Sequence, residues 1–260
     1  MIFPNTIQDF AKALVTQIFT DLVFINKPHK IYNSKMAKRI AKMGTDDFYP
    51  GEYPIMKWIR ENRTKYNIEA VHSGATRIAI LFDENSSLHD VVIKIPMGKL
   101  NYCSRERKFY TYAKAEKVEQ YFAPTEYIGS VTIPVITGRV QIPLYLMTRA
   151  ENCQDAIYDS AAEYLRGSDL ESEFCVEYYV DDDEDINSVS EEELINRYLC
   201  NCESEQIVEY AFAETGIAGD LYNFCQRYNI NDIHEDNVGL IKDKNGFSHY
   251  VIIDYAGYGT

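Results

Sequence analysis

The sequence predicts an α+β fold, and three patterns in its 260 residues indicate this class. The N-terminal part has apolar residues at helical spacing. From Glu69 onward, runs of β-branched residues alternate with polar turns, a texture typical of paired strands. Helix-like stretches and a last pair of strand-like runs follow. With 46% hydrophobic residues the chain can bury a real core, as one large domain or two small lobes.

Residues 1–68 are expected to form an N-terminal helical extension. One helix is predicted over residues 6–24, because apolar side chains recur at helical spacing. These are Ile7, Phe10, Leu14, Ile18 and Leu22. A second helix is predicted over residues 54–66. Between them, residues 27–42 carry six basic residues and no acidic one. This cluster could pack against the chain's own acidic segment or meet nucleic acid.

Residues 69–96 contain two strand-like stretches, separated by the polar turn at 83–90, and a helix is predicted from Ser104 onward. Lys94 lies inside the apolar run Val-Val-Ile-Lys-Ile-Pro. A lysine there either reaches solvent at a sheet edge or finds an anionic partner. Glu106 on the following helix is the candidate partner.

The net charge of −14 is concentrated in one part of the chain. Residues 151–214 carry 20 acidic and 2 basic residues. The densest stretch, residues 180–194, repels itself, so we expect a mobile loop or a solvated helix start within an acidic insertion at about residues 168–193. The insertion could solubilise the protein or dock a basic partner. Its charge disfavours nucleic acid as a ligand of this face.

The C-terminal part carries the pattern closest to chemistry. One long helix, or two, is predicted over residues 203–229 and leads into Asp232-Ile-His-Glu-Asp-Asn237. A hairpin across Asn245-Gly246 is then expected to bring Asn237 and Asp254 to the same end of two paired strands. An aspartate that accepts a hydroxyl proton, with an asparagine and an aspartate that hold Mg²⁺, is what phosphoryl transfer requires.

Seven strings in order carry a resemblance to a known family: HSGATR, VVIKIP, SRERKFY, QYFAP, LYLMTRAE, NDIHEDNVGLI and VIIDYAG. Together they resemble the protein-kinase-like fold, particularly small kinase-like proteins of bacteriophages and bacteria. The resemblance rests on the occurrence of all seven strings in this order. The resemblance implies a small β-rich nucleotide-binding lobe over residues 69–148 and a reduced helical lobe over residues 149–260. It also implies ATP and Mg²⁺ as cofactors.

The resemblance assigns a role to each matched residue. Lys94 would contact the α- and β-phosphates, with Glu106 as its ion-pair partner. Asp232 would be the catalytic base, and Asn237 and Asp254 would hold magnesium. The other nucleotide-binding positions are Gly74, Ala75 and Thr76 in a turn, Met147 and Thr148 at the hinge beside adenine, and His234. His234 would either contact the γ-phosphate or have a structural role.

Some positions depart from the family pattern. The turn at Gly74 has one glycine where protein kinases have three. Asn231, in place of arginine, precedes Asp232, so switching by a phosphorylated activation loop is not expected. Asp254-Tyr-Ala-Gly257 has an extra residue before the glycine, and the sequence ends six residues after Asp254. We therefore expect protein-substrate docking to be absent or supplied by the N-terminal helices or a partner chain.

Two hypotheses of different class follow. In the first, the chain is an ATP-Mg²⁺-dependent serine/threonine protein kinase, or it phosphorylates a small-molecule hydroxyl. In the second, it is a catalytically silent kinase-like binding or inhibitor protein acting on a host or partner protein. The combination of Lys94, Glu106, Asp232, Asn237 and Asp254 favours the first, because a silent module gains nothing from it. A protein substrate or partner is expected in both.

Other features of the sequence bear on the cellular location and on the state of the cysteines. A run of about 18 apolar residues and a signal-peptide pattern are both lacking, so we expect no membrane span and a cytoplasmic protein, in the host cytoplasm if phage-encoded. The six cysteines show no CxxC pair, which predicts reduced thiols and no zinc site or disulfide framework. The sequence does not determine the oligomeric state.

Overall fold

The computed structural model describes residues 3–25, 54–73, 77–96, 101–135, 138–168, 189–215, 218–242 and 245–256. The chain divides into two compact units. Unit 1 combines Met1–Thr111 with Pro124–Arg149, and unit 2 combines Tyr112–Ala123 with Ala150–Thr260. Antiparallel sheets and several helices make the fold α+β, as the sequence predicts.

Unit 1 is built on a five-stranded antiparallel sheet. The strands are β1 (Ile68–Ser73), β2 (Arg77–Phe82), β3 (Val91–Pro96), β4 (Thr125–Val135) and β5 (Gly138–Thr148). Their order in the sheet is β1-β2-β3-β5-β4, so β5 lies between β3 and β4. Helix α4 (Tyr102–Glu116) connects β3 to the segment before β4. Its last residues belong to unit 2.

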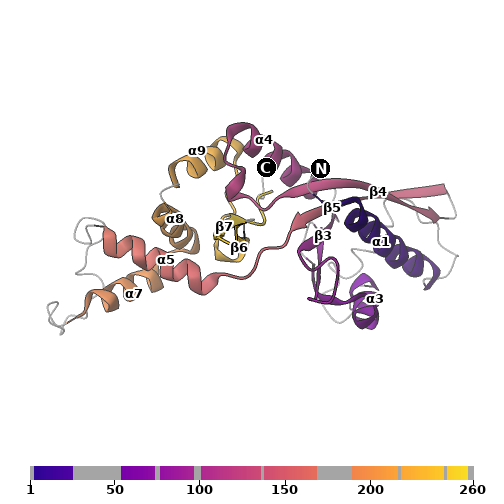
Figure 1. Ribbon diagram of the computed structural model, residues 1–260, viewed down its shortest axis with the longest axis horizontal. Helices are drawn as coiled ribbons and strands as arrows, with labels where there is room; N and C mark the ends of the chain where they lie inside the picture. Colours follow the sequence, from indigo (N-terminus) through magenta and orange to yellow (C-terminus); the bar gives the residue numbers. More distant parts are fainter. Residues whose placement is uncertain are drawn as a thin grey trace. The chain divides into compact units, whose positions relative to one another are not determined.

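One face of this sheet packs on the N-terminal helices, α1 (Asn5–Ile25) and α3 (Pro54–Asn62), with a 3-10 turn at Thr64–Tyr66 between α3 and β1 (Figure 1). Leu14 and Ile18 of α1 are buried in this core, as predicted. Phe10 is 41% exposed, which contradicts its predicted place on the apolar face. Ala11 and Val15 are buried instead, so the buried stripe of α1 is rotated from the predicted one.

Alternation along β3 sends its side chains to opposite faces of the sheet. Ile93 and Ile95 join the core that includes α1 and α3. Lys94 does not belong to that core, because successive residues of a strand point to opposite sides. It contacts Glu106 of α4 on the other face. The sheet is thus apolar on one side and carries a buried polar group on the other.

Unit 2 contains four described α-helices and a short 3-10 turn at Glu119–Tyr121. The helices are α5 (Gln154–Gly167), α7 (Glu191–Asn201), α8 (Ser204–Glu214) and α9 (Ala218–Tyr228). The stretch predicted as one long helix or two is therefore two helices. Ser190 caps α7 by accepting a hydrogen bond from the Glu193 amide at 3.2 Å. Most of the acidic insertion, residues 169–188, lies outside the described residues.

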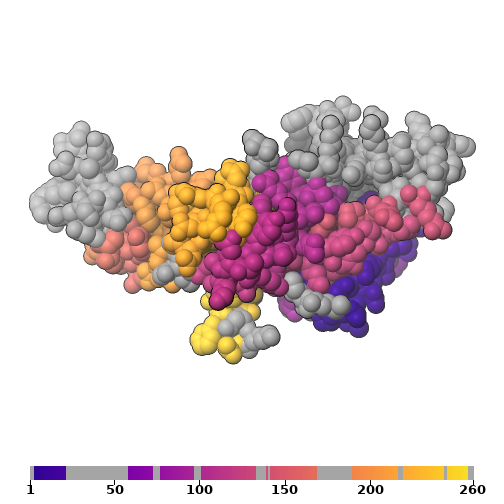
Figure 2. All heavy atoms as spheres, turned by 90° about the horizontal axis from the view of Figure 1, so that it is seen from above, coloured from indigo at the N-terminus to yellow at the C-terminus, as the bar shows by residue number. Residues whose placement is uncertain are grey.

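The predicted C-terminal hairpin is present in unit 2. A 3-10 turn at Glu235–Asn237 leads into β6 (Val238–Lys242), which pairs antiparallel with β7 (Ser248–Ile252). Gly246 has a φ of +85°, a conformation that favours glycine. In Figure 2 the hairpin, in yellow, stands out from the surface of unit 2.

Two expectations drawn from composition can be compared with the described part of the chain. None of the helices in that part is both long and apolar enough to cross a membrane. The five cysteines within it, Cys103, Cys153, Cys200, Cys202 and Cys225, are all free thiols.

Candidate functional site

Lys94 and Glu106 form a buried ion pair in unit 1. The ammonium nitrogen of Lys94 lies 3.0 Å from Oε1 and 3.2 Å from Oε2 of Glu106. Lys94 is 6% exposed and Glu106 is fully buried. Of the two interpretations of Lys94, the structure supports the anionic partner over the solvent-facing edge lysine. Burial makes the pair depend on this geometry, because an ion pair withdrawn from water must replace its hydration with hydrogen bonds.

Arg77 is a second cation on the same carboxylate. Its Nη1 donates to Glu106 Oε1 at 2.9 Å. Arg77 is the first residue of β2, and Ala79 two residues later lies opposite Lys94 in the β2–β3 ladder. Arg77 and Lys94 therefore share one face of the sheet, where both reach Glu106. Sequence reasoning assigned no role to Arg77, although the strand register places it beside Lys94.

In unit 2, the end of α9 sets the direction of the loop that carries Asp232. Asn229 has a φ of 53°, the left-handed conformation that commonly ends a helix. The amide of Ile230 then donates to the carbonyl of Cys225 at 2.9 Å. Ile230 is buried, whereas Asp232 is half-buried with 27% of its side chain exposed. Burial of Ile230 thus anchors the loop, and the carboxylate of Asp232 remains partly accessible to solvent.

The amide side chain of Asn237 closes this loop. Its Nδ2 donates to the backbone carbonyl of Asp232 at 2.8 Å and contacts Nε2 of His234 at 2.9 Å. A carbonyl only accepts, which fixes the amide nitrogen on this side. The second hydrogen of this amide nitrogen is directed to Nε2 of His234. This contact favours the structural role for His234 over contact with a phosphate.

The oxygen atom of the Asn237 side chain is available to bind a ligand. Within the described residues, no hydrogen bond to Oδ1 of Asn237 is found. Amide and carboxylate oxygens are the ligands that Mg²⁺ prefers, usually only one or two from the protein together with phosphate oxygens and water. The same residues hold no cluster of three or more acidic, histidine or cysteine side chains that would bind a metal on their own.

Asp254 follows directly on a residue bonded to Asn237. The amide of Ile253 donates to the Asn237 carbonyl at 2.8 Å, which extends the β6–β7 pairing by one step. Asp254 is half-buried. The next residue, Tyr255, is fully buried, donates its hydroxyl to the Ala123 carbonyl at 2.9 Å and packs edge-on against Phe122. The contacts of Tyr255 thus anchor the backbone next to Asp254.

Ser204 connects the first turn of α8 to the same loop. Its hydroxyl donates to the Glu235 carboxylate and accepts from the Glu235 backbone amide at 3.1 Å. Glu235 begins the 3-10 turn that ends at Asn237. A further hydrogen bond joins Gln154 Nε2 of α5 to Asp236 Oδ1 at 2.9 Å. Residues that sequence reasoning did not single out therefore position the loop from two helices.

The remaining predicted positions are distributed as follows. Gly74, Ala75 and Thr76 lie outside the described residues. Met147 and Thr148 end β5, where Met147 is buried opposite Val92. The amide of Thr148 donates to the Pro124 carbonyl at 2.9 Å. The structure thus brings together Lys94 with Glu106 in unit 1, and Asp232, His234 and Asn237 with the start of the Asp254 segment in unit 2.

Comparison with protein-family models, with curated proteins and with solved structures returned no match.

Proposed function

We propose that this chain is an ATP-Mg²⁺-dependent phosphotransferase of protein-kinase-like fold, acting on serine or threonine hydroxyls of a protein. The buried Lys94–Glu106 pair carries the proposal. In protein kinases the phosphate-binding lysine stands on the third strand and its glutamate on the helix that follows. Here Lys94 is on β3 and Glu106 on α4, the next helix of the chain.

The loop of unit 2 supports the same function. A kinase catalytic loop has an aspartate followed five residues later by an asparagine, and a further aspartate that holds magnesium. Asp232 and Asn237 have this spacing, and Asp254 follows a residue paired with Asn237. Bound ATP would supply the phosphoryl group, and Asn237 and Asp254 would hold the Mg²⁺.

Each proposed role has a simple physical basis. Lys94 would stabilise the negative charge of the phosphates, and Glu106 would keep its ammonium group in place. Asp232 would take the proton from the acceptor hydroxyl as that oxygen bonds to the γ-phosphorus and ADP leaves. The hydrogen bond from Asn237 to the Asp232 carbonyl couples the base to a metal ligand, so both would be oriented together.

The test is incubation with radiolabelled ATP and Mg²⁺, with label followed on the protein itself and on lysate proteins. Wild type should transfer label, whereas Asp232→Ala and Asp254→Asn should lose transfer. Asp159→Asn removes an exposed carboxylate on α5 and should retain it. Melting temperature with and without nucleotide reports binding separately, because a ligand of the folded state stabilises it.

The outcomes separate the two hypotheses. Absence of label together with no nucleotide-dependent rise in melting temperature would overturn the proposal. A rise without label transfer would also contradict phosphoryl transfer and would identify a catalytically silent nucleotide-binding protein.

A further inference from the structure

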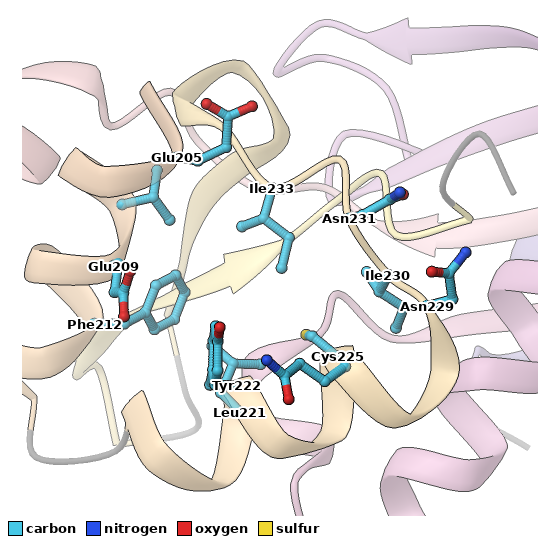
Figure 3. A pocket seen from close by; sticks show the side chains of 12 residues that line it. Glu205, Glu209, Phe212, Leu221, Tyr222, Cys225, Asn229, Ile230, Asn231 and Ile233 are labelled. Carbon is cyan, nitrogen blue, oxygen red and sulfur yellow. The ribbon is translucent and has the colours of Figure 1, made fainter. Parts of the chain in front are cut away.

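Helices α8 and α9 and the residues that follow α9 line an open pocket of about 550 Å³ in unit 2 (Figure 3). Its walls are mainly apolar. They are formed by Val208 and Phe212 of α8, Leu221 and Cys225 of α9, and Ile230 and Ile233 of the following loop. In Figure 3, Phe212 and Ile233 point into the open space. We call this feature the α8–α9 groove. Its volume is in the range of protein sites that bind ligands.

The groove extends along about two turns of α8. Its α8 wall runs from Glu205 to Phe212, and the facing wall is formed by Leu221 to Gln226 of α9 together with the segment after α9. At 1.5 Å per residue the α8 wall is about 10 Å long. That length matches an apolar stripe formed by positions i, i+4 and i+7 of a docked helix. Tyr222, on the α9 wall, is 53% exposed although it is large and aromatic. Exposed aromatic residues of this kind are enriched where proteins bind partners.

The charge beside the groove has one sign. Glu205 and Glu209 lie four residues apart on α8, both exposed and both lining the groove. Like charges at this spacing destabilise a helix. Among the described residues, no ion pair to either carboxylate is found, and α8 itself has no lysine or arginine. The surrounding segment 151–214 carries 20 acidic residues against 2 basic ones. A cationic ligand would remove the repulsion.

We propose that the α8–α9 groove binds a basic amphipathic helix of a protein partner. The apolar face of that helix would enter the groove and cover Tyr222, and its lysine or arginine side chains would pair with Glu205 and Glu209. An acidic segment or a nucleic acid would be repelled here. A neutral apolar molecule would leave the two carboxylates unpaired. The combination of an apolar floor and a carboxylate rim therefore fits a basic amphipathic helix best.

The position of the groove gives binding a second consequence. Asn231 and Ile233 line the groove, and Asp232 lies between them in the chain. A helix docked in the groove would contact the loop that carries Asp232 and restrict its motion. This inference goes beyond the proposed function and does not depend on it, since docking requires neither ATP nor Mg²⁺.

The experiment uses a fluorescein-labelled synthetic peptide of about four helical turns, with leucines at i, i+4 and i+7 and lysines on both flanks. Fluorescence anisotropy with the full-length chain, without nucleotide, should show saturable binding that weakens with added salt. Tyr222→Ala and the double variant Glu205→Gln/Glu209→Gln should each weaken binding at least about tenfold, as hot-spot and charge-pair losses do. All three positions are exposed, so these variants should fold, which circular dichroism checks.

Matched controls exclude general attraction to an acidic protein. Tyr158→Ala removes an exposed aromatic residue of α5, and Glu191→Gln/Glu192→Gln removes two exposed charges of α7. Both should bind the peptide as wild type does. Asp254→Asn, at a position that does not line the groove, should also retain the peptide, so a failure of phosphoryl transfer and a failure of docking are distinguishable.

Several results would overturn the proposal. One is the absence of saturable binding, and another is equal weakening by the control variants. Equal binding of a peptide with glutamates in place of its lysines would also contradict it. So would a dimer in sedimentation that Tyr222→Ala dissociates while the peptide fails to bind, because the occupant would then be a second copy of this chain.

Discussion

Lys94 and Glu106 are joined by two hydrogen bonds, of 3.0 and 3.2 Å, in the interior of unit 1. Arg77 donates to the same carboxylate. The buried carboxylate of Glu106 thus pairs with two cations. The consequences of removing an anion and of removing a cation should therefore differ.

Glu106→Gln should destabilise the fold more than Lys94→Met does. The first change leaves two cations without this carboxylate, whereas the second leaves the Arg77–Glu106 pair in place. Breaking a buried pair by removing one partner costs about 3–5 kcal/mol. Urea unfolding measures both values. Arg166→Met, which removes an exposed pair with Glu163, is the control and should cost about 0–1 kcal/mol. Equal costs for Glu106→Gln and Arg166→Met would contradict this ranking.

Asn237→Ala should loosen the loop that carries Asp232. It removes both contacts of the amide nitrogen and leaves the half-buried Asp232 carbonyl without that donor. A cost of about 1–3 kcal/mol follows. The rise in melting temperature with ATP and Mg²⁺ should also shrink, because the metal ligand is lost. The control is Asn201→Ala, since Asn201 Nδ2 makes a similar hydrogen bond to the Arg197 carbonyl at 2.8 Å at an exposed position of α7. An unchanged nucleotide response in Asn237→Ala would argue against its role at the metal.

Gly239→Ala should destabilise unit 2. A Cβ at this position would lie 2.6 Å from Cβ of Ala150 and 2.9 Å from the Glu151 carbonyl oxygen. Glu151 exchanges two 2.9 Å backbone hydrogen bonds with Leu240, so the crowded backbone is held in place. Overpacking of this kind costs about 1–3 kcal/mol.

Gly219→Ala provides the matched comparison. Gly219 lies in the first turn of α9 with open space around it, so alanine should stabilise the helix, by up to about 1 kcal/mol, the value for a helix interior. Both free energies come from urea unfolding. If both substitutions changed the free energy of unfolding in the same direction, the close approach at Gly239 would not be what makes alanine unfavourable there.

The pair between Glu69 and Arg149 should make stability depend on pH. Arg149 Nη1 lies 2.7 Å from Oε2 of Glu69, and Nη2 donates to Oε1 at 2.9 Å. This hydrogen bonding by Arg149 holds the pKa of Glu69 below its usual value. A lowered pKa in the folded state means that the pair stabilises the fold above the ordinary carboxyl pKa of about 4.3. That contribution is lost as the pH falls through the lowered value.

Melting of wild type and Glu69→Gln across pH measures this effect. Wild type should melt higher at pH 7, and the difference should vanish in acid. The magnitude should be small, about 0.2–1 kcal/mol, because the Glu69 side chain is 45% exposed. High salt should reduce the difference at pH 7. A difference that grows as the pH falls would have the wrong sign for this pair.

Local patterns were enough to predict several elements. Helical spacing predicted α1, the helix-like stretch from Ser104 onward predicted α4, and the Asn245-Gly246 turn predicted the hairpin of β6 and β7. The isolated charge of Lys94 in an apolar strand left two alternatives, a solvent-facing edge lysine or an anionic partner, and the structure shows the partner. The long β4–β5 pair was not predicted, although its β-branched residues carry a strand signal. The buried stripe of α1 was misjudged at Phe10, because helical spacing alone does not say which side faces the sheet.

The proximity of candidate-site residues was predictable where they are close in sequence. Asp232 and Asn237 are linked within one loop, so their spacing already implied a connection. The roles of Arg77, Ser204 and Tyr255 were not predictable from spacing. Ser204 lies 31 residues from Glu235, and Tyr255 lies 132 residues from Ala123. Contacts between residues so far apart in the sequence depend on how helices and strands pack together. The periodicity of apolar residues along the sequence does not reveal that packing.

By itself, the sequence determined the α+β class, the strand that holds Lys94, the helix that holds Glu106 and the hairpin beside Asn237. These features follow from periodicity and turn chemistry, which act over a few residues. Only the tertiary structure decided that β5 lies between β3 and β4, that Arg77 shares the Glu106 carboxylate, and that α8 and α9 leave a groove beside the Asp232 loop. The physical reason is that strand order and side-chain packing are set by burial between segments far apart in the chain.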